Sequence, residues 1–313
     1  MSQVRIATRD SYGKALVELG RAHEEIVVLD ADLAESTRTG MFQKEFPERH
    51  IDCGIQEANM MGVAAGLAQS GMVPFCSSFA MFAAGRAYEQ IRNSIAYPSA
   101  NVKICATHAG ITVGEDGATH QCNEDIALMR TLPGMTIINP GDDVEGRAAV
   151  YAAYEMDGPV YLRFGRMAVP VVNDEKTFQF KIGKGTLLKD GNDVTIVATG
   201  LMVATALDAY ELLEKEGIHP QIVNIHTIKP IDVDLLAECA AKTGKVITVE
   251  EHSIIGGLGS AVAEALCERQ PAKLRRIGIP DVFGISGPGQ ELLSYYGLDG
   301  KGIAEVTKEF IGA

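Results

Sequence analysis

The chain has 313 residues, longer than one ordinary domain requires, so two domains are the first expectation. Its 41 acidic residues outnumber its 28 basic ones, and the formal net charge is −13. This balance argues against an extended nucleic-acid or anionic-membrane surface and leaves room for a local basic pocket. With 46% hydrophobic and 22% charged residues, the composition excludes disorder as a description of the whole chain.

Signals for a membrane, secretion or a metal are weak. No apolar stretch reaches the roughly 18 to 20 residues that a membrane helix needs, and segment 1–10 carries two arginines and no apolar run. The six cysteines form no C-x-x-C pair, which favours buried thiols over disulfides or a zinc site. We therefore expect a cytoplasmic protein.

The first half of the chain alternates short β-branched runs with amphipathic segments. Helical periodicity predicts helices over 11–22 and 81–97. Strands are expected at 26–29, 72–75, 102–106, 136–138 and 160–162. Strands alternating with helices at this spacing predict right-handed crossovers and a largely parallel sheet.

The pattern changes after residue 167, where prolines, glycines and Asn173-Asp174 predict a linker that leads to a strand near 178–188. A second α/β series follows, with strands expected at 194–197, 221–225, 246–249 and 276–279. We predict an α/β protein with two three-layer domains of different size. The larger, mainly parallel domain spans 1–168, the linker and first strand of the next domain span 169–192, and the smaller domain spans 193–313.

Glu57 follows a glycine turn and begins a helix rich in Gly and Ala. On position alone, the simpler interpretation is a first-turn carboxylate that complements the helix dipole. The functional interpretation is a carboxylate at the edge where open α/β sheets bind ligands. Phe79 and Phe82 allow a similar choice, because such a pair is ordinarily core. The small residues 83–85 that follow would also let a flat heterocycle stack on the rings.

The loop at 108–121 holds two histidines, two acids and three glycines, which makes it a poor core and a plausible site. His108, Asp116 and His120 could in principle bind a metal, but their spacing matches no zinc pattern, so no metal site is predicted. Arg9 and Arg163 are each compatible with a surface ion pair or with bidentate phosphate binding. The glycine-rich segment 256–260 looks like a dinucleotide turn but lacks the G-x-G-x-x-G register.

Several of these residues together resemble the transketolase family. The matching motifs are Thr8-Arg9, Asp30-Ala31-Asp32-Leu33 with Ser36, Gly54-Ile55-Gln56-Glu57, Ser78-Phe79 and, most specifically, the run 106–121. The resemblance covers essentially the whole chain, yet only the C-terminal half of a full-length transketolase. It implies a domain that binds the pyrimidine of thiamine diphosphate, then the transketolase C-terminal domain. The Gly-Asp-Gly…Asn magnesium motif of the other half is absent from the sequence.

The resemblance also implies roles for individual residues. Glu57 matches the catalytic glutamate that hydrogen-bonds a ring nitrogen of the aminopyrimidine and favours the imino tautomer that generates the ylide. Phe79 would stack on the pyrimidine, Phe82 would line the same pocket, and Asp32 would lie near the cofactor's central part. Residues implied to hold the sugar phosphate are Arg9, Ser36, His120 and Arg163, and those implied to contact substrate hydroxyls are His108 and Asp116.

Two positions depart from the family pattern: Ala58 replaces a histidine after the catalytic glutamate, and Cys76 replaces a pocket aromatic. The expected function is thiamine-diphosphate-dependent ketol transfer between phosphorylated sugars, as the C-terminal subunit of a split transketolase. A separate N-terminal subunit would hold the diphosphate and magnesium in a two-fold symmetric heterotetramer. The alternatives are an enzyme like deoxyxylulose-phosphate synthase or a 2-oxo acid dehydrogenase β-subunit, and a non-catalytic subunit of the same fold.

Overall fold

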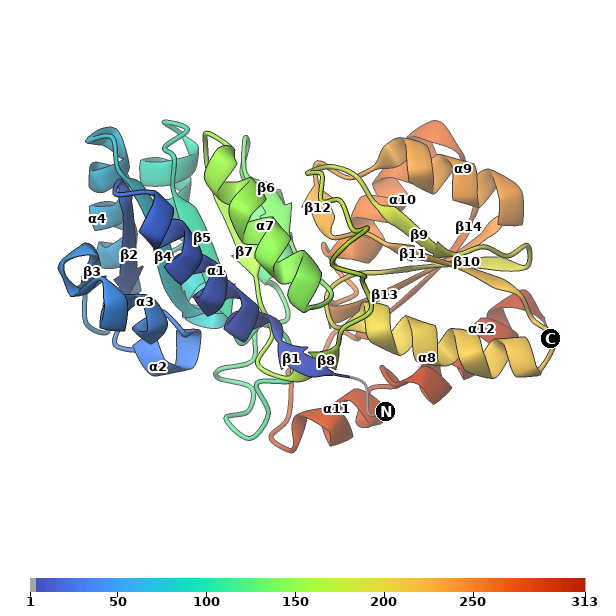
Figure 1. Cartoon of the computed structure of the whole chain (residues 1–313). Helices are drawn as coiled ribbons and strands as arrows, with labels where there is room; N and C mark the ends of the chain where they lie inside the picture. Colours follow the sequence, from blue (N-terminus) through green and yellow to red (C-terminus); the bar gives the residue numbers. More distant parts are fainter. Residues whose placement is uncertain (1–3, 313) are drawn as a thin grey trace.

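The computed structural model describes residues 4–312, which form two α/β domains side by side (Figure 1). The first domain is built on a seven-stranded sheet with the order β12-β6-β7-β5-β4-β2-β3. Its strands are β2 (Ile26–Asp30), β3 (His50–Asp52), β4 (Val73–Phe79), β5 (Lys103–Thr107), β6 (Thr136–Ile138), β7 (Val160–Arg163) and β12 (Thr227–Lys229). Strands β2 to β7 pair in parallel, which confirms the predicted sheet.

Helices cover both faces of this sheet. On one face lie α1 (Thr8–Ala22), α3 (Gly40–Glu45) and α7 (Asp143–Glu155), and on the other α4 (Glu57–Gln69), η2 (Met81–Arg86), α5 (Tyr88–Gln90), η3 (Ile91–Ala96) and α6 (Asp125–Arg130). Neighbouring strand residues alternate between the faces, because Val28 and Phe75 pack with the α1 side and Leu29 and Cys76 with the α4 side. The short elements α2 (Ala34–Thr37) and η1 (Pro47–Arg49) lie between β2 and β3.

The single helix predicted over 81–97 is wrong in detail. The structure has two π-helical segments, η2 and η3, separated by Ala87 and the short α5. Gly85 and the fully buried Ala83 and Ala84 leave no bulky side chains to enforce regular α-helical packing at the sheet surface. Such wide turns are frequent at functional sites, and η2 lies directly after the strand that ends in Phe79.

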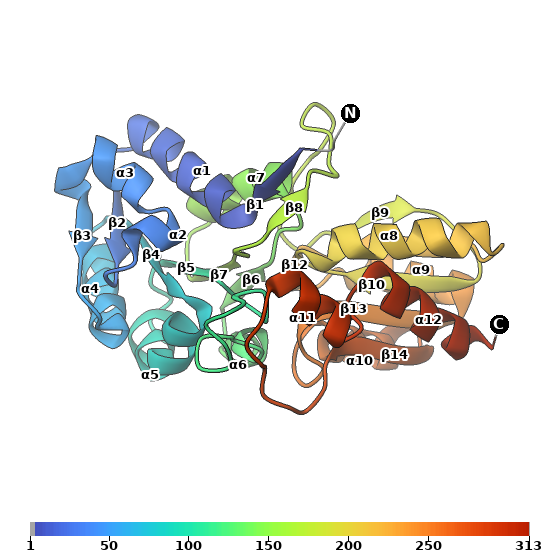
Figure 2. The ribbon, with the colours of Figure 1, turned by 90° about the horizontal axis from the view of Figure 1, so that it is seen from below.

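The second domain has a five-stranded sheet with the order β14-β13-β10-β11-β9. Its strands are β9 (Thr186–Lys189), β10 (Val194–Ala198), β11 (Pro220–Asn224), β13 (Lys245–Ser253) and β14 (Lys273–Ile279), all parallel to their neighbours except β9. Figure 2 shows its helices on either side: α8 (Met202–Lys215), α9 (Val233–Thr243), α10 (Leu258–Arg269), α11 (Gly289–Tyr295) and α12 (Gly300–Ile311).

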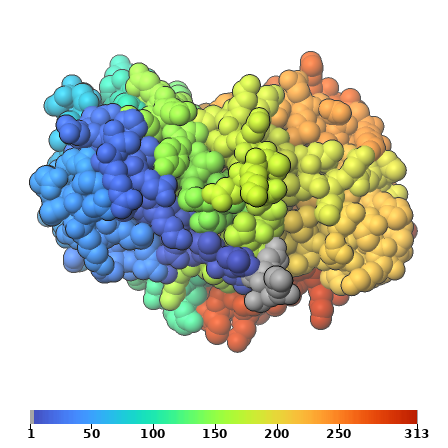
Figure 3. Space-filling view, in the orientation of Figure 1, coloured from blue at the N-terminus to red at the C-terminus, as the bar shows by residue number. Residues whose placement is uncertain are grey.

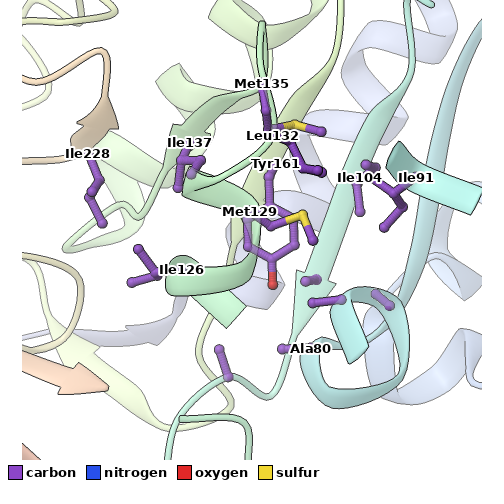
Figure 4. Close-up of a cluster of buried hydrophobic side chains, with 14 of the residues drawn as sticks. Ala80, Ile91, Ile104, Ile126, Met129, Leu132, Met135, Ile137, Tyr161 and Ile228 are labelled. Carbon is purple, nitrogen blue, oxygen red and sulfur yellow. The ribbon is translucent and has the colours of Figure 1, made fainter. Parts of the chain in front are cut away.

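The domains are joined in two ways. The segment 171–185 runs over the surface between them (Figure 3, yellow-green), and the strand expected near 178–188 begins only at Thr186. In addition, β12 leaves the second domain and pairs antiparallel with β6. Figure 4 shows that Ile228 of β12 joins the same apolar cluster as Ile126 and Ile137 of the first domain. The apolar core is therefore continuous between the domains.

Two short strands, β1 (Arg5–Ala7) and β8 (Ala168–Pro170), pair antiparallel where the chain enters and leaves the first domain. Within residues 4–312, no helix is long and apolar enough to cross a membrane.

Candidate active site

Most of the predicted site residues gather at the carboxyl edge of the first sheet. Asp32 follows β2, Glu57 follows β3, Phe79 ends β4 and His108 follows β5. These four strands are parallel neighbours in the sheet, so their carboxyl ends lie side by side. This is the edge at which open α/β sheets bind ligands.

Glu57 is the first residue of α4 and is only 1% exposed. The hydroxyl of Ser78 donates to its Oε1 at 3.1 Å, and Nη1 of Arg86 donates to its Oε2 at 2.7 Å. Burying a carboxylate is costly unless it is paired and hydrogen-bonded, and these two donors meet that need. Sequence reasoning missed Arg86, because only the fold brings η2 to the start of α4.

A group of flat side chains lies beside Glu57. The ring of Phe79 stacks on the imidazole of His108 at a centroid distance of 3.9 Å and lies 6.3 Å from the ring of Phe82. The imidazole of His120 meets Phe82 edge-on at 5.3 Å, and the guanidinium of Arg86 lies 4.7 Å from the same ring. Phe79 and Phe82, which sequence alone allowed as simple core, thus border polar and charged groups.

His108 is held in a backbone conformation that non-glycine residues rarely adopt, with φ of 56°. Its Nε2 accepts from Nη1 of Arg9 at 3.0 Å, which leaves Nδ1 to donate to the hydroxyl of Thr107 at 2.9 Å. Burial lowers the pKa of His108 to about 3, helped by the nearby charges of Arg9, Arg166 and Arg38. The imidazole is therefore neutral at physiological pH. Strained backbone of this kind clusters at ligand sites.

Three arginines converge around His108. Arg9 donates from Nη1 to the carbonyl of Ser36 at 2.9 Å, and its buried Nε has no partner within residues 4–312. Burial lowers the pKa of Arg9, with a further contribution from Arg38. An unpaired buried N–H among converging cations is suited to an anion, because charge-assisted hydrogen bonds are the strong ones.

The turn after β2 is organised by a buried carboxylate. Asp30 accepts from the hydroxyls of Thr37 and Thr39 at 2.7 and 2.8 Å, and burial raises its pKa. Asp32, two residues on, is exposed and has φ of 61°, and its N–H donates to Oδ1 of Asp52 at 3.0 Å. The turn thus presents Asp32 at the sheet edge. Ser36 contacts Arg9 through its backbone carbonyl.

The second domain fixes the loop 108–121. Oε1 of the buried Glu251 accepts from the N–H of Thr112 at 2.6 Å, and Nε2 of Gln121 donates to the carbonyl of Ile285 at 2.8 Å. On this loop Asp116 is exposed, and Nδ1 of His120 lies 2.9 Å from the hydroxyl of Thr119. The loop's placement therefore depends on a domain that supplies none of the predicted site residues.

Arg163 is not brought to this group. It is only 4% exposed, and its Nε and Nη2 donate to the carboxylate of Asp125 at 2.8 and 3.2 Å. Nη2 also donates to the carbonyl of Glu251 at 3.0 Å, which joins the two domains. Arg163 therefore forms an ion pair, but a buried one with the fully buried Asp125 rather than the surface pair that the sequence allowed. Arg166, three residues later and not singled out from the sequence, lies near Arg9 and His108 instead.

The glycine-rich segment 256–260 does not form an open dinucleotide turn. The buried carboxylate of Glu250 accepts from the N–H groups of Leu258 and Gly259 at 2.6 and 2.8 Å, so the start of α10 is already occupied. A Cβ at Gly257 would lie 2.0 Å from Oε2 of Glu250. Within residues 4–312 no cluster of His, Cys, Asp or Glu is arranged to hold a metal ion.

A cavity of about 730 Å³ adjoins the aromatic group. Phe82, Arg86 and Thr119 line it from the first domain, and Val282 and Phe283 line it from the second. Of the two departures from the family pattern, Cys76 is fully buried in β4 and Ala58 is partly exposed on α4. Burial raises the pKa of the Cys76 thiol, which makes it an inert apolar side chain.

The first domain thus brings a buried carboxylate, two aromatic rings and several arginines together at the carboxyl edge of the parallel sheet of an α/β protein. The family descriptions "Transketolase, pyrimidine binding domain" and "Transketolase, C-terminal domain" match residues 4–172 and 183–303. The chain belongs to the transketolase family.

Individual relatives agree with this. The chain is 53% identical to a putative transketolase C-terminal section of Methanocaldococcus jannaschii over 99% of this chain and 98% of the relative. It is 37% identical to human transketolase over 98% of this chain but only 49% of the human one. A solved structure described as "Split gene transketolase, inactive beta4 tetramer" is 53% identical, covers 98% of both chains and superimposes with a TM-score of 0.90.

Proposed function

We propose that this chain is the C-terminal subunit of a thiamine-diphosphate-dependent transketolase, which transfers a two-carbon ketol unit between phosphorylated sugars together with a separate N-terminal subunit. The observation that carries the proposal is Glu57, a carboxylate that is 1% exposed, lies at the carboxyl edge of the sheet and accepts a hydrogen bond from Ser78, the residue before Phe79. Burying a carboxylate costs folding free energy, and buried carboxylates at a ligand-binding edge are therefore candidates for a functional role.

The residues present fit the pyrimidine of thiamine diphosphate. Phe79 and Phe82 offer faces for a flat ring, and Glu57 offers a carboxylate oxygen to a ring nitrogen. The bound cofactor supplies the electron sink for ketol transfer. Glu57 would hold a proton at the pyrimidine nitrogen, while the buried hydroxyl of Ser78 keeps the carboxylate oriented.

The pocket next to the carboxylate fits a phosphorylated sugar. Arg9, Arg38 and Arg166 lie around a neutral His108, and although Arg38 pairs with Asp10 and Arg166 with Glu115, the unpaired Nε of Arg9 offers a donor to an anion. Asp116 and His120 on the same loop can exchange hydrogen bonds with sugar hydroxyls, and the imidazole of His108 can do so where a hydroxyl replaces its contact with Arg9 or Thr107. This cationic pocket favours a phosphorylated sugar over the unphosphorylated 2-oxo acid of the dehydrogenase alternative.

A second subunit is needed to complete the site. The chain matches only 49% of the length of human transketolase, so the missing half would hold the diphosphate and its magnesium ion. The solved relative described as an inactive tetramer supports the same view, since a C-terminal subunit assembled with its own copies lacks that half. A two-fold symmetric assembly of both subunits is the expected active form.

The direct test is reconstitution of the complex with thiamine diphosphate and magnesium. We expect the wild-type complex, but not the lone chain, to transfer ketol units. Glu57→Ala should slow exchange of the cofactor's C2 proton, followed by NMR, by about 10²- to 10⁴-fold. The matched control is Glu48→Ala, which removes an exposed carboxylate in η1. Full transfer by the lone chain would contradict the need for a partner, and unimpaired proton exchange in Glu57→Ala would contradict the role of Glu57.

A further inference from the structure

Both carboxylate oxygens of Glu57 are already engaged within the chain. Ser78 donates to Oε1 at 3.1 Å and Arg86 donates to Oε2 at 2.7 Å. A pyrimidine nitrogen that is to share a proton with Glu57 needs one of these oxygens. Each oxygen can accept a second hydrogen bond, but Glu57 is only 1% exposed, so an incoming ring can reach an oxygen only if a group that covers the carboxylate moves away.

The two donors differ in their freedom to move. Ser78 lies in the interior strand β4 and is completely buried, so the sheet fixes its backbone and neighbours leave its side chain little room to move. Arg86 is the last residue of the π-helical segment η2, and its side chain is 48% exposed. Arg86 also lines the cavity of about 730 Å³ between the domains, which offers room for a different rotamer. Its contact with the face of Phe82 at 4.7 Å is compatible with such a rotation about the long side chain.

We propose that Arg86 is a positioning residue that neutralises Glu57 in the cofactor-free subunit and is displaced from Oε2 when the pyrimidine binds. The inference rests on the proposed function. It follows from the burial of Glu57, because a buried carboxylate that lost one donor without gaining another would be left partly unpaired. Arg86 and the cofactor thus compete for the same oxygen.

Competition gives Arg86 opposite effects on two measurable quantities. Removing the guanidinium leaves the buried carboxylate less well paired, so the cofactor-free chain becomes less stable. The same change removes the competitor, so the cofactor binds more tightly. If Oε2 is free in about a tenth of the wild-type molecules, the gain in affinity is about tenfold. An arginine that merely supported the fold would not tighten cofactor binding, and one that bound the cofactor would weaken binding when removed.

The experiment uses Arg86→Met, which keeps an apolar stem against Phe82. Arg92→Met is the control, because Arg92 is exposed and donates a hydrogen bond to the side chain of the neighbouring Asn93. We expect Arg86→Met to lower the unfolding midpoint of the lone chain and to lower the dissociation constant of thiamine diphosphate, with magnesium, in the reconstituted complex. Arg92→Met should change neither. In a Glu57→Gln background, Arg86→Met should lower the unfolding midpoint much less, because the charge it neutralises is gone.

A second variant, Arg86→Lys, keeps the charge on a shorter and non-planar group, and it should shift both quantities in the same directions by smaller amounts. It decides the question if Arg86→Met does not fold. Weaker or unchanged cofactor binding in the Arg86 variants, with normal binding by the wild-type complex, would overturn the competition while leaving the proposed function intact. Failure of the wild-type complex to bind thiamine diphosphate would overturn both.

Discussion

The carboxyl edges of the two mainly parallel sheets differ in whether their polar groups find partners within the chain. At the first edge, Asp32 and His108 adopt positive φ, and Arg9 keeps an unpaired buried N–H. At the second edge, the side chains are consumed by the protein itself: Glu250 occupies the start of α10, and Glu251 accepts from Thr112 in the first domain. The first edge therefore leaves a buried polar group without a partner, whereas these carboxylates at the second edge are hydrogen-bonded within the chain.

The difference shows how a domain without predicted site residues contributes to the site. The loop 108–121 of the first domain covers part of the second domain's edge. The hydrogen bond from Thr112 to Glu251 therefore pairs a carboxylate at the second edge and also positions the loop at the first edge. Arg163 and Asp125 sit where the edges meet, and Arg163 reaches the carbonyl of Glu251. Variants that break the contacts between the two edges test whether the second domain positions the site.

The largest effect is expected for Asp125→Ala, which strands Arg163 in the interface without a counter-charge and removes the acceptor of the Tyr161 hydroxyl. Loss of one partner of a buried pair costs about 3–5 kcal/mol of unfolding free energy, measured in urea. The exposed Asp234 pairs with Arg269 at 3.8 Å, and Asp234→Ala should cost less than about 1 kcal/mol. Similar losses in the two variants would show that the pair does not hold the edges together.

Next comes Gly110→Ala, at the point where the loop passes Glu251. Gly110 has φ of +75°, and an added Cβ would lie 2.3 Å from Cδ of Glu251. We expect a loss of about 2–4 kcal/mol, measured in urea, with faster proteolysis of the loop 108–121, because the backbone penalty and the clash add. Gly134→Ala is a matched control with φ of +74° and nothing within 4 Å, so it carries the backbone penalty alone. Equal losses of unfolding free energy in Gly110→Ala and Gly134→Ala would show that the contact with Glu251 does not contribute.

A smaller effect is expected when Arg166→Leu is introduced into the reconstituted complex. Losing one charge-assisted contact of about 1.5–3 kcal/mol should raise KM for a phosphorylated sugar about 10- to 100-fold and leave kcat nearly unchanged. The KM for the same sugar without its phosphate should change much less. Arg21→Leu, at a surface pair with Glu45, serves as the control. An equal rise in KM for both sugars would place Arg166 outside the anion pocket.

The smallest effect concerns pH. Burial raises the pKa of Glu145 to about 8, so the folded chain keeps a proton that the unfolded chain releases near 4.5. Raising the pH through this interval therefore favours unfolding. Glu250 and Glu251, whose pKa values burial raises to about 7, act in the same direction. Buried histidines with lowered pKa values act in the opposite direction as the pH rises to 6.5; they are His108, His226 and His252.

The clean interval is therefore pH 6.5 to 8, where we expect Glu145 alone to lower the unfolding free energy by about 1–2 kcal/mol. Glu145→Gln should flatten this decline, as measured by urea unfolding at several pH values. Glu155→Gln changes an exposed carboxyl at the end of the same helix, α7, and should leave the slope as it is. An unchanged slope in Glu145→Gln would mean that Glu145 is ionised in the folded chain.

The fold could be predicted where sequence periodicity is strong. The strand expected at 136–138 is β6, and the alternation of strands and helices correctly predicted the parallel sheets. Two features of the fold could not be predicted from the sequence, for different reasons. Strand β12 belongs by sequence to the second half of the chain, and its pairing with β6 is set by a tertiary contact that no local pattern encodes. The π-helical segments keep the same apolar residues as a regular helix and differ only in backbone hydrogen bonding.

The site divides in the same way. Glu57 and His108 follow predictable strands, so their convergence at one edge follows from topology, although their chemical roles stay predictions. Arg163 and Arg166 are the same residue type three positions apart, but Arg163 pairs with the fully buried Asp125 and Arg166 pairs with the exposed Glu115, a difference that only the fold decides. Arg86 reaches Glu57 from 29 positions away, a contact that no local pattern encodes.

The borrowed strand β12 also decides where this chain can be cut. A truncation in the surface segment 171–185 would leave the first domain's sheet ending at β6, with an unpaired row of backbone donors and acceptors and with Ile137 stripped of its neighbour Ile228. Exposed sheet edges of this kind recruit other chains. The first domain expressed alone should therefore self-associate or precipitate, and a soluble fragment would need β12 supplied in trans or a charged residue placed on the open edge.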